Sequence, residues 1–148
     1  MRSHTMIELR QPYYELSPNV IKPMRQALQG LENGPLSNEL IELVFLRVSQ
    51  INGCAYCLEM HAKALRKSGV DQVKLDSLAG WKVSHQFTEK ERAALAWAES
   101  LTLIAEINAE DDVYQPLLEF FSAEEIVDLT LAASMMNAFN RVAIGMRQ

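Results

Sequence analysis

Apolar residues recur at helical spacing along nearly the whole chain, and no segment shows the apolar–polar alternation of a strand. Two capping boxes, at 88–91 and 122–125, each open a long helical run, the first predicted to extend to 104 and the second to about 147. In a capping box, the first and fourth residues satisfy each other's backbone N–H groups, so these two helix starts are strongly specified. The pattern predicts an all-α helical bundle of about six to seven helices.

The same periodicity predicts where the other helices lie. We expect them over residues 18–31, 36–48, 54–68, 71–80 and 111–121, the last disturbed by Pro116. Residues 40–48 are apolar almost all the way round, which is typical of a central, buried helix. Residues 1–16 show no sustained period and are predicted to form an irregular N-terminal arm. Within that arm, residues 1–5 precede Met6 and could be left over from an expression tag, so we give His4 no role.

Length and composition indicate one domain spanning residues 1–148, long enough to bury a core without disulfides or metals. The chain is 49% hydrophobic and 22% charged, which is typical of a soluble globular protein. A net charge of -5 disfavours nucleic acid and anionic membrane as partners. No leader is recognisable, and polar residues interrupt the longest apolar tract, 126–146, so we expect a cytoplasmic protein.

The stretch 51–61 holds both cysteines of the chain and one of its three histidines. Asn52-Gly53 predicts a turn, and Cys54 follows at the start of a helix. At about 100° per residue, Cys57 and His61 lie on the same helix face as Cys54. Two thiols and an imidazole therefore converge at a helix start.

Cysteines at a helix start are suited to redox chemistry. The thiolate is the reactive form, and the free N–H groups of the first turn stabilise it. A peroxide can oxidise one thiolate to a sulfenic acid, which the second cysteine then converts to a disulfide. His61 can accept or relay the thiol proton, and Glu42, an acid among apolar neighbours on the preceding helix, is a candidate base.

These residues carry a resemblance to a known family. The matching positions are Glu42, Cys54-Ala55-Tyr56-Cys57 and His61, set in residues 46–53 and followed by residues 62–69. Residues 87–89, 97–99 and 136–141 are similar as well. The chain thus resembles the alkylhydroperoxidase D (AhpD)-like, carboxymuconolactone decarboxylase family over most of residues 15–148. The core of the motif occupies about 36–104.

The resemblance implies an all-helical subunit that assembles into trimers or hexamers and acts as a thiol peroxidase. It implies that Cys57 is the peroxidatic cysteine and Cys54 the resolving one, with Glu42 and His61 in the proton relay. One position departs from the best-studied pattern, which has histidine where this chain has Tyr56. A phenol can pass a proton on but is a poor base near neutral pH, so Tyr56 is a candidate relay residue that would slow the relay. The decarboxylase branch generally lacks the cysteine pair, so we do not expect decarboxylation.

The predicted function is therefore a thiol-dependent peroxidase or disulfide oxidoreductase that reduces hydroperoxides. No bound cofactor or metal is expected. An external thiol reductant is required, and the family precedent suggests a lipoyl-type dithiol or a lipoylated protein. Three alternatives stay open: a metal-binding module, a non-redox enzyme of a small carbon acid or lactone, and a redox-sensing scaffold. Zinc is the metal considered, because Cys54, Cys57 and His61 offer three ligands.

Two further expectations concern the surface and the last helix. The apolar helix at 40–48 and the final helix offer more apolar surface than one small bundle needs, so we predict a homo-oligomer. Asn137, Asn140 and Arg141 lie on nearby faces of the otherwise apolar final helix. Their position suggests buried hydrogen bonds, helix contacts or a subunit interface.

Overall fold

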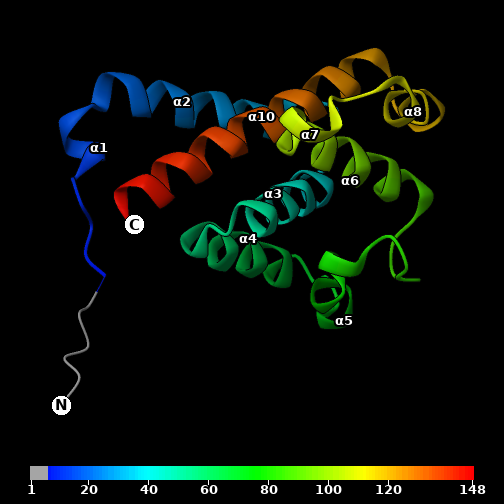
Figure 1. Cartoon of the computed structure of the whole chain (residues 1–148), viewed down its shortest axis with the longest axis horizontal. Helices are drawn as coiled ribbons and strands as arrows, with labels where there is room; N and C mark the ends of the chain where they lie inside the picture. The colour runs from blue at the N-terminus through cyan, green and yellow to red at the C-terminus, as the bar shows by residue number, and fades with distance from the viewer. Residues whose placement is uncertain (1–6) are drawn as a thin grey trace.

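The computed structural model describes residues 7–148, and every regular element in that range is helical (Figure 1). The prediction of an all-α bundle is confirmed. The proposed tag remnant and His4 lie outside the described residues. None of the described helices is both long and apolar enough to cross a membrane.

Five longer helices form the body of the molecule: α2 (Pro18–Gly30), α3 (Asn38–Asn52), α4 (Ala55–Lys67), α6 (Glu89–Thr102) and α10 (Ala123–Met146). Short helices connect or precede them: α1 (Tyr13–Leu16), α5 (Gln72–Asp76), α7 (Ile104–Ile107), α8 (Asp111–Tyr114) and α9 (Leu117–Phe120). Two single 3₁₀ turns, η1 (Leu31–Asn33) and η2 (Leu78–Gly80), complete the described elements.

Both predicted capping boxes are present. The Thr88 and Ser122 side chains each accept a hydrogen bond from the backbone N–H three residues on, and Glu91 and Glu125 return it. Ser37 caps α3 by accepting from the Leu40 N–H at 3.2 Å. These contacts fix the starts of three helices independently of the rest of the fold.

The structure corrects three details of the predicted elements. The N-terminal arm contains one helical turn, α1, because Pro12 precedes it and Ser17 ends it. The helix predicted to run to 104 ends at Thr102, and Leu103 leaves helical geometry before α7. The segment 111–121 divides at Pro116 into α8 and α9.

Helix α3 lies at the centre, packed against α4, α6 and α10 (Figure 1). All apolar residues from Leu40 to Val48 are buried, so this helix is the core element that its composition predicts. Its apolar surface is covered by the chain's own helices, and it therefore leaves nothing for a subunit interface. That part of the reasoning for a homo-oligomer was wrong, so the prediction of a homo-oligomer now rests on α10. The expectation of trimers or hexamers stays what the family resemblance implies.

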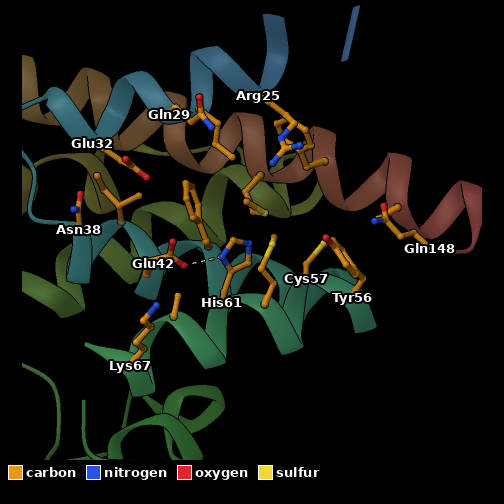
Figure 2. A pocket seen from close by; sticks show the side chains of 18 of the residues that line it. Arg25, Gln29, Glu32, Asn38, Glu42, Tyr56, Cys57, His61, Lys67 and Gln148 are labelled. Atoms are coloured by element: carbon orange, nitrogen blue, oxygen red, sulfur yellow. Dashed lines mark hydrogen bonds and ion pairs between the residues drawn. The ribbon is translucent and has the colours of Figure 1, made fainter. Parts of the chain in front are cut away.

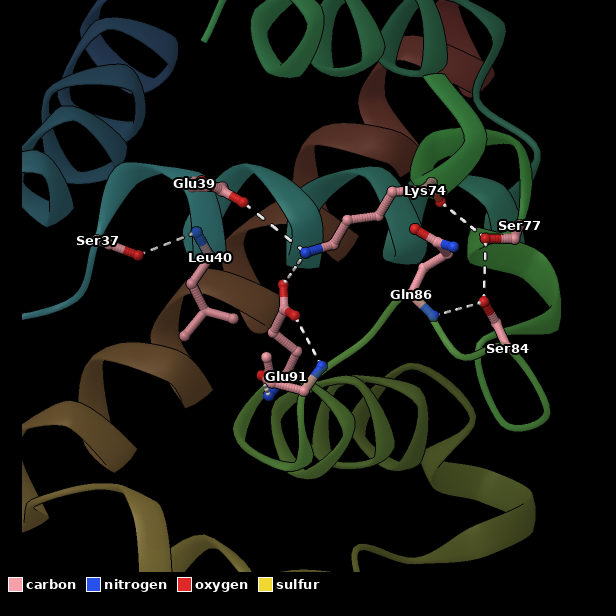
Figure 3. Close-up of polar contacts among 9 residues, drawn as sticks. Ser37, Glu39, Leu40, Lys74, Ser77, Ser84, Gln86 and Glu91 are labelled. Atoms are coloured by element: carbon pink, nitrogen blue, oxygen red, sulfur yellow. Dashed lines mark hydrogen bonds and ion pairs between the residues drawn. The ribbon is translucent and has the colours of Figure 1, made fainter. Parts of the chain in front are cut away.

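Polar contacts hold the segment after α4 against this body (Figure 3). Lys74 of α5 donates to Glu91 of α6 at 2.7 Å and lies 3.9 Å from Glu39 of α3. Ser84 links the following loop to Ser77 and to the backbone N–H of Gln86. These contacts join α5 and its loop to α3 and α6, away from the cysteine pair.

Candidate functional site

The cysteine pair is presented by the tight turn between α3 and α4. Gly53 has φ +72°, a left-handed conformation that glycine adopts without cost. The N–H groups of Gly53 and Cys54 both donate to the Ser49 carbonyl, at 2.9 and 3.1 Å. This turn places Cys54 at the N-cap of α4, where its Sγ accepts a hydrogen bond from the Cys57 N–H at 3.4 Å. The predicted turn and helix start are thus confirmed.

The two cysteines are joined in a disulfide, with Cα atoms 5.3 Å apart. Both are buried, at 1% and 3% exposure, and they pack against Ala143 and Ile144 of α10. Cys57 lines a large groove, whereas Cys54 lines a separate, smaller cavity of about 140 Å³. The two sulfur atoms therefore have different access, and only Cys57 faces the groove.

Glu42 and His61 form a direct contact beside Cys57, with Glu42 Oε2 2.7 Å from His61 Nδ1 (Figure 2). The His61 ring packs against Phe45, with centroids 5.1 Å apart. Glu42 was expected to be buried among apolar neighbours, but its side chain is 28% exposed because it lines the groove. His61 Nε2 is buried and has no hydrogen-bond partner within residues 7–148. His61 therefore makes one side-chain hydrogen bond, to Glu42, among these residues.

The groove has a volume of about 860 Å³. Helix α2 forms one wall and α4 the other, while α3 and α10 supply the floor. Figure 2 shows Cys57 and Tyr56 towards one end and Lys67 towards the other, with His61 between them. Because Cys57, His61 and Glu42 all line the groove, a molecule bound there can contact the thiol and the imidazole together.

Tyr56 lies on the rim of the groove and is 40% exposed. It makes no hydrogen bond to Glu42 or His61 in the part of the chain that the structure describes. His61 instead contacts Glu42 directly, with no intervening side chain. The candidate relay role of Tyr56 therefore has no contact in this structure to support it.

The N-terminal arm lines the groove near Tyr56, through Tyr13 and Tyr14. Tyr13 donates a hydrogen bond to Gln148 Oε1, and its ring lies 4.7 Å from that of Tyr14. Arg10 is held at the end of α10 through its backbone N–H and its guanidinium. Burial, followed by the neighbouring Tyr14, raises the pKa of Tyr13 to about 12. The arm was predicted to be irregular, yet it supplies part of the site.

A buried polar network fixes the turn against α10. The Asn52 amide donates to Asn137 and Asn140 at 2.9 and 3.0 Å. Asn140 in turn donates to Ser49 Oγ at 3.1 Å, and Asn137 donates to Thr102 at 3.1 Å. The expectation of buried hydrogen bonding for Asn137 and Asn140 is confirmed, whereas Arg141 is exposed. The network connects α3, α6 and α10 at the base of the cysteine turn.

Some residues that line the groove could not be predicted from the sequence. Arg25, Tyr13 and Tyr14 come from segments far from the motif and reach the groove only through tertiary packing. Met60 could have been found, because it neighbours His61 and follows Cys57 by one turn. Among residues 7–148, no group of three or more His, Cys, Asp or Glu side chains is arranged to hold a metal ion.

The chain is all-helical, and a Cys-x-x-Cys pair lies at a helix start beside a Glu–His contact. These features are those of a helical protein with a redox-related role, and comparison with known proteins supports this class. The profile of the carboxymuconolactone decarboxylase family matches residues 18–100. The uncharacterized protein YdfG of Bacillus subtilis is 34% identical over 137 residues, 93% of each chain. The chain therefore belongs to the carboxymuconolactone decarboxylase family.

Solved structures share the fold of this chain. A protein of unknown function from Agrobacterium tumefaciens, related by name to the antioxidant defence protein AhpD, is 39% identical with a TM-score of 0.90. The match covers 95% of this chain and 97% of that one, so the AhpD-like fold is established. The debrominase Bmp8 in complex with 2,3,4-tribromopyrrole is 18% identical, with a TM-score of 0.80 over 90% of this chain and 72% of that one. That similarity shows the fold alone.

Proposed function

We propose that this protein is a thiol-dependent peroxidase that reduces hydroperoxides by cycling Cys54 and Cys57 between dithiol and disulfide. The observation that carries the proposal is the arrangement at the groove. Cys57 lines it together with His61, whose buried Nε2 has no hydrogen-bond partner among residues 7–148, and Cys54 is bonded to Cys57 from behind the groove. Family membership and the AhpD-like fold support a peroxidase-related redox role.

In the first step, the Cys57 thiolate attacks one oxygen of the peroxide. An S–O bond forms, the O–O bond breaks, and the leaving alkoxide takes a proton to become an alcohol. His61 accepts the thiol proton at Nε2 and returns it to the leaving oxygen, while the Glu42 carboxylate, 2.7 Å from Nδ1, stabilises the imidazolium. Cys57 leaves this step as a sulfenic acid.

In the second step, the Cys54 thiolate attacks the Cys57 sulfur. The S–S bond forms and hydroxide leaves, taking a proton to become water. The sum is one hydroperoxide and one dithiol giving an alcohol, water and a disulfide. The product of this step is the disulfide present in the structure.

An external dithiol must then reduce the disulfide. Attack on Cys57, the sulfur that faces the groove, expels Cys54 as a thiolate at the N-cap, where the Cys57 N–H donates to it. A stabilised thiolate leaves faster, so this direction of attack is favoured. We propose a lipoyl-type dithiol as the reductant and no bound cofactor.

Steady-state turnover tests the proposal. Wild-type protein with a reduced lipoyl dithiol should consume an organic hydroperoxide, and Cys57→Ser should not. Arg66→Gln is a matched control, because Arg66 is exposed near the far end of the same helix. Disulfide formation without sustained consumption would favour a redox-sensing scaffold. Stoichiometric Zn²⁺ bound through Cys54 and Cys57 in purified protein would defeat the redox proposal.

A further inference from the structure

The groove is much larger than a small peroxide needs. Its volume of about 860 Å³ lies in the range of about 300–1,000 Å³ typical of sites for larger organic ligands. Along α4 it extends from Tyr56 to Ser68, about 18 Å at 1.5 Å per residue. A site for hydrogen peroxide requires none of this length. The size of the groove indicates a substrate with an extended carbon body.

The lining of the groove suits a flexible hydrocarbon. Phe45 of α3, Met136 and Phe139 of α10 and Met60 of α4 line it between its two ends. Methionine side chains are unbranched and polarisable, and they adapt to apolar ligands of varied shape. An alkyl chain laid along these residues would replace water on apolar surface, which favours binding.

The end of the groove nearest the cysteines carries a solvent-exposed cation, Arg25. Figure 2 shows Arg25 and Tyr56 at the Cys57 end, whereas Glu32 and Lys67 lie at the other. The Arg25 guanidinium lies over the Tyr14 ring, 5.5 Å from its centre. Among the described residues it forms no ion pair. A guanidinium without a carboxylate partner can bind the carboxylate of a ligand through two parallel N–H···O hydrogen bonds.

The acids of the groove do not neutralise this cation. Glu42 is held by His61, and Glu32 lies in η1, seven residues after Arg25, a separation of about 10 Å along a helix. The whole protein carries a net charge of -5 and repels anions at long range. Arg25 therefore provides a local positive charge on a protein whose net charge is negative.

We propose that the preferred substrate is an amphipathic hydroperoxy acid. Its carboxylate binds Arg25, and its hydroperoxide, on a carbon close to the carboxylate, reaches Cys57 at the same end of the groove. The rest of the hydrocarbon lies along the apolar floor. The reaction is the one given above, in which the hydroperoxide becomes an alcohol and the dithiol becomes a disulfide. This inference rests on the proposed peroxidase function and adds the substrate class to it.

The test compares a fatty acid that carries its hydroperoxide next to the carboxyl group with its methyl ester, which has the same carbon body and no charge. Wild-type protein should reduce the acid with a kcat/KM about tenfold or more above that of the ester, the factor expected for a charge-assisted hydrogen bond. Arg25→Gln should bring this ratio close to one, and Arg25→Lys should give an intermediate ratio because lysine lacks the planar fork. Lys22→Gln removes the same charge from an exposed position of α2 outside the groove and should keep the wild-type ratio.

A binding measurement separates this inference from the peroxidase proposal. The corresponding hydroxy acid is chemically inert here, and calorimetry on the oxidised protein should show binding that Arg25→Gln weakens about tenfold or more. If no peroxide is reduced but this binding is found, the peroxidase function fails and the anion site stands. Equal rates for acid and ester in wild-type protein, or hydroxy-acid binding unchanged by Arg25→Gln, would overturn the inference.

Discussion

Cys57 and Cys54 are neighbours in one helical turn, yet their surroundings differ. Cys57 shares the groove with His61, whereas Cys54 occupies the N-cap behind it. The sequence predicted the shared helix face and the N-terminal position, because both follow from spacing along a single helix. It could not predict which sulfur meets the groove, since α2 and α10 complete that surface from distant parts of the chain.

The two cysteines should give different products when each is replaced alone. Cys54→Ser should accumulate a sulfenic acid at Cys57 after treatment with hydroperoxide, because the resolving thiolate is missing. Cys57→Ser should react no faster than an ordinary thiol. Trapping with a sulfenic-acid reagent followed by peptide mass analysis distinguishes the two. A sulfenic acid found at Cys54 in Cys57→Ser, formed as fast as the wild-type reaction, would reverse the assigned roles.

Glu42 should contribute to catalysis through His61. Glu42→Gln keeps a hydrogen-bonding group near Nδ1 but removes the charge that stabilises the imidazolium. We expect the oxidation rate of Cys57 to fall about 10²-fold, the lower part of the range for general acid–base catalysis. Glu59→Gln is the matched control, since Glu59 is exposed on α4 and outside the groove. Equal rates for Glu42→Gln and wild type in stopped-flow oxidation would remove Glu42 from the relay.

Tyr13 should make stability sensitive to alkaline pH. Burial raises its pKa to about 12, above the value of about 10 for an unfolded phenol, so folding favours the protonated form. Its contribution is complete below about pH 10 and is lost as the pH rises towards about 12. Denaturant unfolding on either side of this window should show a smaller loss for Tyr13→Phe than for wild type. Identical losses in the two proteins would contradict the assignment.

Among the secondary-structure elements, α10 does more than its apolar composition suggests. Its Asn137 and Asn140 side chains are buried and bond to the cysteine turn through Asn52 and Ser49. The sequence identified Asn137 and Asn140 as exceptions on an apolar helix, and it predicted hydrogen bonds for them. Their partners could not be predicted, because the crossing of α3 and α10 brings together residues about ninety positions apart. The break at Leu103 was likewise invisible, since the apolar spacing continues through it.

Removing the buried amide of Asn140 should destabilise the protein. Asn140→Ala leaves the Ser49 hydroxyl without its donor and the Asn52 amide with one acceptor fewer, which should cost about 1–3 kcal/mol. Arg141→Ala, on the exposed side of the same helix, should change stability by less than about 0.5 kcal/mol. Urea unfolding of both variants, in the same redox state and with unchanged slope, provides the comparison. A cost for Asn140→Ala no larger than the control's would show that the network stabilises little.

For the whole molecule, the fold was predicted well and the site in part. Capping boxes, turns and the apolar helix at 40–48 are local signals, and each produced the expected element. The groove depends on how α2 and the N-terminal arm pack on α4, which no local pattern encodes. Glu42 illustrates the difference. Its candidate role followed from the motif, but its partly exposed position and its contact with His61 required the assembled structure.

The surface of α10 predicts assembly of the subunit. Val127 and Leu131 lie one turn apart on this helix and are 56% and 48% exposed, forming an apolar strip with no cover in the described chain. We expect a homo-oligomer, and the double substitution Val127→Glu with Leu131→Glu should reduce its mass. Val83→Glu, at an exposed loop position, should leave the mass unchanged. Light scattering that gives a monomeric mass for the wild type would contradict the prediction.

The central claim is that Cys54 and Cys57 form a peroxide-reactive dithiol. It is tested most directly by mixing the fully reduced protein with an organic hydroperoxide in a stopped-flow instrument and following the intact mass of quenched samples. We predict rapid loss of about two hydrogens as the disulfide forms, much faster than oxidation of a free thiol at the same pH. Oxidation no faster than that of a free thiol, or accumulation of higher oxides in place of the disulfide, would contradict the account.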